Sequence, residues 1–259
     1  MFSFAEYLDL PLIWGGLISV AIFMYVFLDG FDLGIGILMP FASDEKDRTR
    51  MFNSIAPFWD ANETWLVLGG GGLFAAFPLA YSIVMPSVYL PVIIMLLGLI
   101  FRGVAFEFRF KAHAGHKKFW EYAFHLGSVT AAVMQGIILG SYVQGTVVSH
   151  HSFAGEAFDW LTPFSLLTGV SLAAGYILLG AAWLVWKTEG DLQEWARKRA
   201  AYSGLIVMIF MGLVSLSVLF LKNGIADRWF GPAFFYLLPI PFLTSITFGI
   251  YYILICFIY

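Results

Sequence analysis

Seven apolar segments dominate the sequence, and each is long enough to cross a lipid bilayer as a helix. A hydrocarbon core of about 30 Å requires roughly 20 apolar residues in an α-helix, and open strands would leave backbone groups unpaired in lipid. Only 12% of the residues are charged, about half the usual share in a soluble domain. The sequence therefore predicts a polytopic, all-α membrane bundle with spans at residues 11–38, 55–77, 82–101, 122–146, 161–186, 201–221 and 234–258.

The connections between these spans are short, so residues 1–259 are predicted to form a single transmembrane domain. The longest polar stretch, residues 187–199, contains basic residues and a tryptophan, and we expect it to form a short helix on the headgroup surface. The first apolar segment lacks a preceding basic flank and is too long for a cleavable signal sequence, so it is interpreted as the first span. The net charge of −3 is too small and too mixed to favour nucleic-acid binding.

Basic residues mark one side of the predicted bundle. Twelve of the fourteen Lys and Arg residues fall in the connections that follow the first, third and fifth spans. The positive-inside rule places these connections in the cytoplasm, so the N-terminus is predicted outside and the C-terminus inside. This alternation also supports the second span, which contains Asp60, Glu63 and four consecutive glycines.

Ionisable side chains gather near the cytoplasmic ends of the first four spans. Charged groups are costly inside a bilayer, and those that occur there are usually paired, hydrated or functional. The spacing of Asp29 and Asp32 in the first span places both on one helix face. The second span repeats this spacing and the next two add further groups, so the candidates are Asp29, Asp32, Asp60, Glu63, Arg102, Glu107, Glu121 and His125.

Two interpretations of these residues compete. In the structural one, Arg102 pairs with a carboxylate, Asp60 caps the second helix and the other groups touch headgroup water. In the functional one, the carboxyl groups line a hydrated inlet and relay protons from the cytoplasm toward the membrane interior. Asp60 is then the principal relay group, because Phe58, Trp59 and Trp65 could exclude bulk water from it. The number of carboxyl groups on one side favours the functional interpretation.

Residues that could bind a haem or a metal cluster are scarce. An axial haem ligand must lie deep within a span, and only His125 of the five histidines is near one. The single cysteine, Cys256, excludes an internal disulfide and a thiolate cluster. The adjacent side chains of His150 and His151 diverge, which disfavours a surface metal site. The sequence thus predicts no cofactor, no metal and no catalytic redox group bound by this chain.

Two other classes of protein remain open on composition alone. A proton-coupled or ion-coupled transporter would place its site near the bilayer midplane, between broken helices, and the clustering of charges near one face disfavours it. A purely structural or assembly subunit would use its carboxylates as ties between helices.

Several motifs resemble subunit II of the cytochrome bd quinol oxidases, and their cyanide-insensitive branch in particular. The motifs occur in the family's order: FLDGFDLGIGILMPF (27–41), NSIAPFWDANETWLVLGGGGLFAAFP (53–78), LIFRGVAFEFRFK (99–111), GSVTAAVMQGIILGSYVQG (127–145) and the block DWLTPFSLLTGV…KTEG (159–190). The resemblance runs over essentially the whole chain. Members of this family are usually longer, with at least one further span, so we expect this chain to be shortened at its C-terminus.

The resemblance implies a haem-free subunit of a terminal respiratory oxidase in a prokaryotic plasma membrane. Its partner, subunit I, would hold two b-type haems and one d-type haem, oxidise quinol and reduce oxygen to water. Some relatives hold a quinone in subunit II as a structural lipid, and some complexes include a small single-helix accessory subunit.

The resemblance also implies roles for individual residues. The aspartate of the WD pair is Asp60, which the family uses for proton uptake. Arg102 belongs to the FR motif and is expected to hold one carboxylate electrostatically. The DGFD motif and the acidic residue before the glycines of the fourth span complete the predicted proton route, which consists of Asp60, Glu63, Asp29, Asp32, Glu121 and Arg102.

Overall fold

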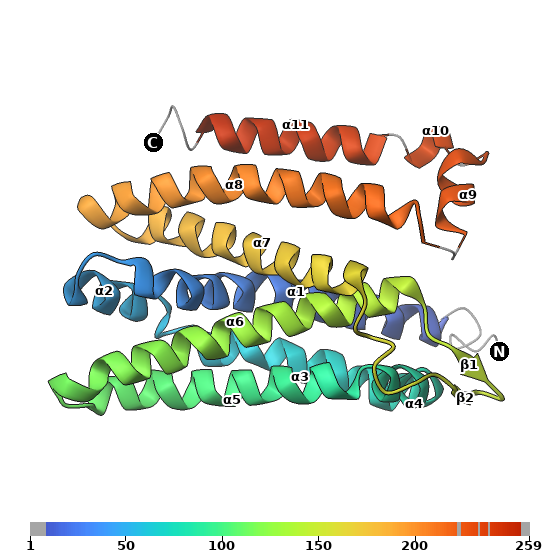
Figure 1. Cartoon of the computed structure of the whole chain (residues 1–259), viewed down its shortest axis with the longest axis horizontal. Coiled ribbons are helices and arrows are strands. Elements are labelled where there is room, and N and C mark those ends of the chain that lie inside the picture. The colour runs from blue at the N-terminus through green and yellow to red at the C-terminus, as the bar shows by residue number, and fades with distance from the viewer. Residues whose placement is uncertain (1–8, 222–223, 233, 238, 255–259) are drawn as a thin grey trace, which may run out of the picture.

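A computed structural model shows a bundle of long helices that run side by side (Figure 1). The structure describes residues 9–221, 224–232, 234–237 and 239–254. The elements are, in chain order, α1 (Leu10–Leu38), the 3-10 helix η2 (Met39–Phe41), α2 (Glu45–Ile55), α3 (Trp59–Ala76), α4 (Pro78–Ser87), α5 (Tyr89–Lys111), α6 (Ala114–Gln144), the antiparallel strands β1 (Val148–Ser149) and β2 (Ser152–Phe153), α7 (Pro163–Lys187), α8 (Asp191–Val218), α9 (Ile225–Phe230), α10 (Phe234–Leu237) and α11 (Pro239–Ile253).

Five helical segments of the described chain are long and apolar enough to cross a membrane, which supports the predicted all-α membrane class. They are Leu10–Phe41, Tyr89–Lys111, Gly115–Gln144, Pro163–Lys187 and Asp191–Val218. The predicted second and seventh spans correspond to α3 and α11, which are helical but do not belong to this set. α3 has 18 residues and includes two acidic side chains, and α11 has 15 residues.

The predicted third span, residues 82–101, has the wrong boundaries. The chain forms two helices there, α4 and α5, which are separated at Val88. Pro91 contributes to the break, because it has no N–H to donate to the carbonyl of Ser87 and its ring crowds that carbonyl. α5 then continues to Lys111, so Arg102 lies well inside a helix and not at the end of a span.

The separate headgroup helix predicted at residues 187–199 is also wrong. After α7 the chain reverses at residues 188–190, where Gly190 adopts a positive φ of 70°. α8 then runs without interruption from Asp191 to Val218. The polar segment therefore forms the first turns of a long membrane helix.

α2 is an amphipathic helix that no apolar segment of the sequence predicts. Its N-cap is Asp44, whose carboxylate accepts a hydrogen bond of 2.7 Å from the N–H of Asp47. Its apolar face buries Met51, Phe52 and Ile55. α2 thus begins with a standard side-chain cap and is held by packing against the ends of the longer helices.

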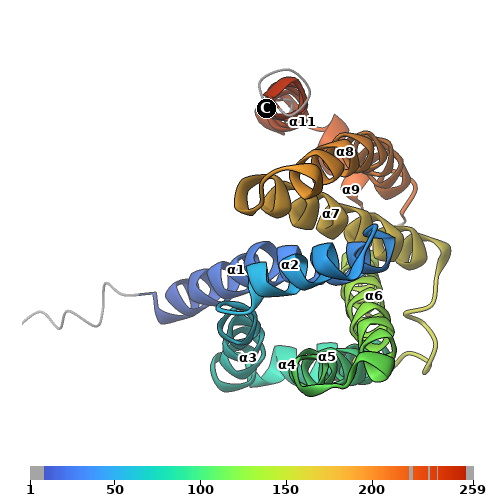
Figure 2. The same ribbon diagram turned by 90° about the vertical axis from the view of Figure 1, so that its left-hand side faces the viewer.

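α1 lies at the centre of the bundle and packs against α3, α6 and α7, while α5 pairs with α6 and α7 pairs with α8. In the end-on view, α1, α3, α5 and α6 form the sides of a square, and α7, α8 and α11 extend beyond α1 (Figure 2). Glycines bring α1 and α7 together. A Cβ atom at Gly34 would overlap the carbonyl group of Tyr176, and one at Gly180 would lie 2.6 Å from the carbonyl carbon of Gly34. The two backbones are therefore in direct contact.

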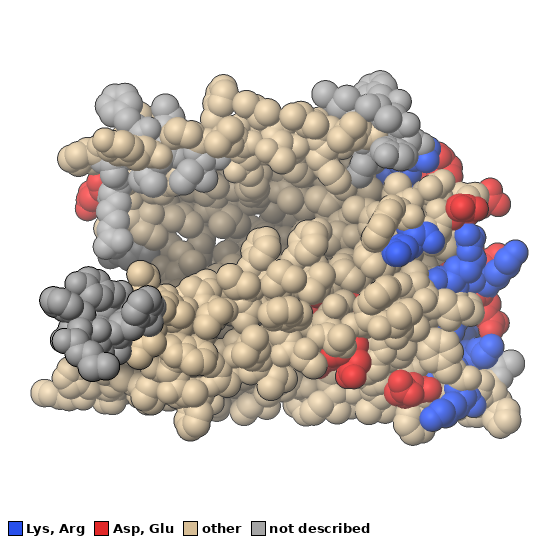
Figure 3. Space-filling model, turned by 180° about the vertical axis from the view of Figure 1, so that it is seen from behind, with Lys and Arg blue, Asp and Glu red and all other residues tan. Residues whose placement is uncertain are grey.

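The two ends of the bundle differ in charge. Lys and Arg side chains gather at one end (Figure 3). This end, here called the basic end, carries α2, the last turn of α7 and the first turns of α8 (Figure 1). The opposite end, here called the hairpin end, carries α4 and the β1–β2 hairpin. His150 and His151 form the hairpin's turn with φ values of 48° and 61°, as a tight two-residue turn requires.

Candidate functional site

A group of charged side chains, here called the inner cluster, joins α1, α3 and α5 and consists of Asp29, Asp32, Glu63 and Arg102. The Nη2 atom of Arg102 lies 2.7 Å from Oδ1 of Asp29 and 3.9 Å from Oδ2 of Asp32. Its Nη1 atom lies 3.8 Å from Oε2 of Glu63. The side chains of Arg102 and both aspartates are completely buried, whereas that of Glu63 is 28% exposed. The cluster therefore extends from an enclosed ion pair to a carboxyl group at the surface.

Local structure explains how these groups meet. Asp29 and Asp32 are three residues apart on α1 and share one face of it. Arg102 lies on α5, which faces α1 across the square (Figure 2). α6 approaches α5 closely at Gly127, where a Cβ atom would lie 2.9 Å from the backbone nitrogen of Arg102. Because α6 has no side chain at that point, it packs against the backbone of α5 beside Arg102. The depth of the guanidinium in the bundle is thereby fixed.

Asn62 completes the inner cluster, although it was not among the predicted site residues. Its Nδ2 group donates a hydrogen bond of 2.8 Å to Oδ2 of Asp32 and a longer one of 3.4 Å to the carbonyl of Leu28. The residue is buried. A signal for it was present in the sequence, because an amide side chain inside a membrane span usually bonds to a neighbouring helix.

The cluster contains more acid than base. One guanidinium can neutralise one carboxylate, and three carboxyl groups surround Arg102. Among the described residues, no aligned hydrogen bond reaches the guanidinium, either oxygen of Asp29 or Oδ1 of Asp32. Buried polar atoms in proteins are normally satisfied by protein groups, ordered water or a proton. The arrangement is chemically suited to holding and exchanging protons among carboxyl groups.

Asp60 lies at the edge of this cluster. Its side chain is exposed, and its charge acts on the neighbouring Glu63. The shielding from water that the sequence led us to expect is not provided by the described residues, and Phe58 is itself 41% exposed. The predicted capping role is wrong, because Phe58 is the N-cap of α3 and no side chain caps this helix. Asp60 instead occupies the first turn, where the helix N-terminus stabilises a negative charge.

Glu121 belongs to a second charged group, here called the basic-end cluster. Its Oε1 atom accepts hydrogen bonds from Nε and Nη2 of Arg109 at 3.1 and 2.9 Å. Its Oε2 atom lies 2.9 Å from Nε of Arg48. Arg109 also donates to Oγ1 of Thr49 at 3.0 Å, and its guanidinium lies 4.3 Å from the centre of the Phe52 ring. One carboxylate thus joins α2, α5 and α6, and the structure separates Glu121 from the inner cluster with which the sequence grouped it.

The remaining candidates are more isolated. The Nδ1 atom of His125 lies 3.2 Å from the carbonyl oxygen of Gly36. Glu107 is exposed and forms no ion pair within the described part of the chain. No group of three or more His, Cys, Asp and Glu side chains among the described residues could hold a metal ion. Cys256 lies outside the described residues.

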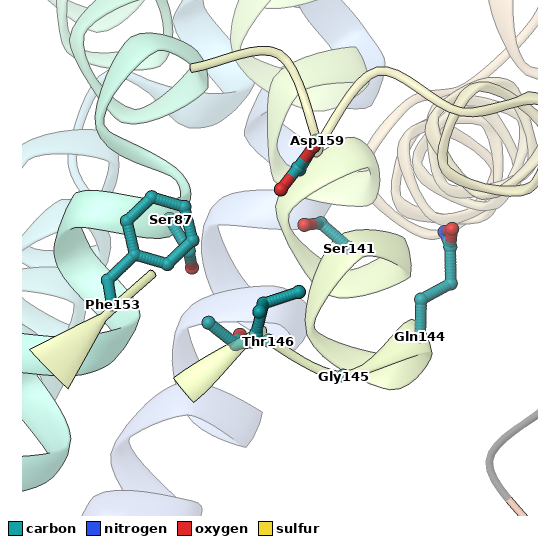
Figure 4. A pocket seen from close by; sticks show the side chains of 8 residues that line it. Ser87, Ser141, Gln144, Gly145, Thr146, Phe153 and Asp159 are labelled. Atoms are coloured by element: carbon teal, nitrogen blue, oxygen red, sulfur yellow. The ribbon is translucent and has the colours of Figure 1, made fainter. Parts of the chain in front are cut away.

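Two hollows lie away from both clusters. A polar cavity of about 270 Å³ opens near the hairpin end (Figure 4). Its polar groups serve local structure: Oδ2 of Asp159 accepts from the N–H of Glu156 at 2.8 Å, and the side chain of Gln144 bonds to Thr162 at 2.7 Å. An apolar groove of about 540 Å³ separates α7 from α11, and the space-filling view shows the molecule hollowed in this region (Figure 3).

Comparisons with known proteins give a consistent result. The model of the family "Cytochrome bd terminal oxidase subunit II" matches residues 10–258. Cytochrome bd-I ubiquinol oxidase subunit 2 of Escherichia coli (strain K12) is 32% identical over 226 residues, which cover 85% of this chain and 60% of the relative. Cytochrome bd ubiquinol oxidase subunit 2 of Bacillus subtilis (strain 168) is 34% identical over 209 residues, which cover 79% of this chain and 62% of the relative. The chain therefore spans about 60% of the length of these relatives.

The fold is also found in a solved structure. A chain from the structure of bd oxidase from Geobacillus thermodenitrificans aligns with a TM-score of 0.77 and 16% sequence identity, covering 96% of this chain and 76% of that one. At this identity, the likeness supports the fold alone. The family model, by contrast, matches the sequence of nearly the whole chain, including the residues of both charged clusters. The chain therefore belongs to the cytochrome bd terminal oxidase subunit II family.

Proposed function

We propose that this chain is the haem-free subunit of a quinol:oxygen oxidoreductase and supplies a cytoplasmic proton route to its partner subunit. One observation carries the proton route: the carboxyl groups pass from exposed Asp60, through half-buried Glu63, to fully buried Asp29 and Asp32 beside Arg102. A proton route needs acceptors at successive depths, and intramembrane carboxyl groups are the usual ones. Family membership supplies the reaction that would consume these protons.

In this assignment the partner, subunit I, holds two b-type haems and one d-type haem and carries out the redox chemistry. Quinol protons leave on the outer side, and the protons that convert oxygen to water enter from the cytoplasm. The family resemblance of the motifs also implies a small accessory subunit and a structural quinone in the complex. The partnership is tested by purifying the chain from its host membrane: a copurifying protein with red-shifted, d-type haem absorbance supports it.

The proposed topology has seven spans, with α3 and α11 added to the five long helices. The basic end faces the cytoplasm of a prokaryotic cell, because the positive-inside rule orients short connections in this way. The N-terminus is then outside, and the C-terminus is inside. Both charged clusters lie toward the cytoplasmic half of the plasma membrane in this orientation.

Each residue of the route has a proposed role. Asp60 receives protons at the surface of α3, and Glu63 passes them toward the buried aspartates. Arg102 holds Asp29 in place by charge. Glu121 holds α2 and α5 in place at the cytoplasmic end of the bundle through its two arginine partners.

The experiment compares Asp60→Asn with Glu107→Gln in the assembled complex, reconstituted in vesicles. Both variants neutralise an exposed carboxyl group, but only Asp60 neighbours the inner cluster. We expect Asp60→Asn to slow proton uptake and oxygen consumption together, and Glu107→Gln to leave both unchanged. Wild-type rates in Asp60→Asn would remove Asp60 from the mechanism.

A structural role is the second candidate, and the fully buried contact between Arg102 and Asp29 favours it. Buried ion pairs often tie helices together without taking part in chemistry. In that case, acid-to-amide variants would lower the yield of the complex, yet turnover would equal that of the wild type once the amounts of complex are matched.

A further inference from the structure

Three neutral polar side chains form a hydrogen-bonded chain through the middle of the bundle. They are Tyr25 on α1, Gln135 on α6 and Tyr176 on α7. The hydroxyl group of Tyr176 donates to Oε1 of Gln135 at 2.7 Å, and Nε2 of Gln135 donates to the hydroxyl oxygen of Tyr25 at 2.6 Å. The two tyrosines are only 4% and 1% exposed. In such apolar surroundings these bonds hold all three side chains in a fixed orientation.

The hydrogen-bonded chain has a direction. The amide oxygen of Gln135 accepts the proton of one phenol, and the amide nitrogen donates to the oxygen of the other. Because the oxygen of Tyr25 acts as the acceptor, its own hydroxyl proton remains available for a further partner. A buried hydroxyl group in this situation requires an acceptor nearby.

Asp29 is the nearest carboxyl group along α1 that could accept this proton. It follows Tyr25 by four residues on α1 and therefore lies on the same face of the helix. The ring of Tyr176 packs on the backbone of the next residue, Gly30, where a Cβ atom would lie 2.7 Å from Cε1 of the ring. The charge of Asp29 acts on both phenols.

The two oxygens of the Asp29 carboxylate have different surroundings. Oδ1 faces Arg102 at 2.7 Å. Oδ2 is also buried, and no group within the described ranges donates an aligned hydrogen bond to it. Tyr25 thus has a proton to donate, and Asp29 has an oxygen to accept it, one helical turn apart.

We propose that Tyr25 is a positioning residue for Asp29. Its hydroxyl group, oriented by Gln135 and Tyr176, donates to Oδ2 of Asp29 through one ordered water. This bond fixes the carboxyl group opposite Arg102. The inference rests on the proposed proton route, in which Asp29 is a buried acceptor, and it adds three side chains on the hairpin-end side of the inner cluster.

The test uses the complete complex with its partner subunit. Tyr25→Phe keeps the ring and removes only the hydroxyl group, and Tyr202→Phe makes the same change at an exposed position on α8. Infrared difference spectra identify the carboxyl band of Asp29 by its loss in Asp29→Asn. We expect Tyr25→Phe to shift this band and to slow proton uptake by about threefold to tenfold, the range that one hydrogen bond provides. Tyr202→Phe should change neither measurement.

A second measurement separates positioning from general destabilisation. If Tyr25 acts through Asp29, the double variant Tyr25→Phe, Asp29→Asn takes up protons at the rate of Asp29→Asn alone. Multiplied losses in the double variant, or an unmoved carboxyl band in Tyr25→Phe, would overturn the inference. The proposed route fails separately, when Asp29→Asn itself leaves proton uptake at the wild-type rate. The infrared shift alone then decides whether Tyr25 bonds to Asp29.

Discussion

The guanidinium of Arg102 and the carboxylate of Asp29 are 2.7 Å apart in the centre of the bundle, and solvent reaches neither side chain. Transferring two such charges from water is costly, and their mutual attraction only offsets that cost. The intact pair therefore contributes little net stability. Removing one member is nevertheless strongly destabilising, because the other charge stays buried. Without Arg102, two buried aspartates would lack a cation, and without Asp29, Arg102 would keep only its longer contacts to Asp32 and Glu63.

Replacing Arg102 by Met tests this asymmetry. The variant keeps much of the side chain's volume and leaves Asp29 and Asp32 without a cation. We expect the free energy of unfolding of the protein to fall by about 3–5 kcal/mol, as measured by thermal unfolding in detergent. Arg197→Met is the control, since its partner Glu194 is exposed on the surface of α8, and it should change stability by less than about 1 kcal/mol. Equal effects of the two variants would contradict the prediction.

The glycine contact between α1 and α7 predicts a steric effect. A Cβ atom in Gly34→Ala would overlap the carbonyl group of Tyr176, and backbone atoms cannot move aside by changing rotamer. We expect a loss of about 1–3 kcal/mol, the usual cost of overpacking, and a lower yield of folded protein. Gly175→Ala makes the same change on α7, where no atom lies within 4 Å, and should be neutral or slightly stabilising. A harmless Gly34→Ala would show that the two backbones are farther apart.

The basic-end cluster predicts a local effect. Glu121→Gln removes the charge that holds Arg48 and Arg109, so α2 loses its main polar tie to α5 and α6. Hydrogen bonds to charged groups provide about 1.5–3 kcal/mol each, so the amides of α2 should exchange with deuterium at least tenfold faster. Exchange in α7 serves as the internal control and should not change. Uniform acceleration in both helices would indicate global destabilisation instead.

The exposed pair of Glu45 and Lys117 predicts a small pH dependence. The hydrogen bond from Lys117, at 2.9 Å, holds the pKa of Glu45 below its ordinary value. A carboxyl group with a lowered pKa in the folded state stabilises the fold above its ordinary pKa, and this stabilisation disappears as the pH falls through the lowered value. The melting temperatures of the wild type and of Glu45→Gln should therefore differ slightly at neutral pH and converge in acid. A difference that grows in acid would contradict this sign.

The sequence predicts the long helices well because their length and apolar character leave few alternatives. It also predicts that Asp29 and Asp32 share a helix face, and both side chains are buried together. Arg102 shows where such reasoning fails. A hydropathy window ends at an arginine, since an ionised side chain is costly in lipid, but here carboxylates from two other helices offset that cost and α5 continues. Partners that are distant in the chain cannot be read from local composition.

Neutral polar residues were missed for a related reason. Gln135 and the two tyrosines of its hydrogen-bonded chain hardly change the hydropathy of their spans, and each is unremarkable by itself. Their significance arises from the packing of three helices, which places donors opposite acceptors. The predicted grouping of Glu121 with the inner cluster is wrong for a different reason. Similar depth along neighbouring helices does not imply proximity, and arginines on α2 and α5 hold this side chain apart from the inner cluster.

The contact of Gly34 with α7 has a mechanical consequence. Most helix pairs meet through side chains that can change rotamer, and their spacing therefore fluctuates. Where peptide groups touch, the two axes cannot approach more closely, because no side chain lies between them to change rotamer. Hydrogen bonds tolerate errors of only a few tenths of an ångström, and a fluid bilayer provides no such accuracy. The crossing therefore sets the shortest distance between the axes of α1 and α7, which keeps Tyr176 aligned with α1 while the surrounding lipid moves.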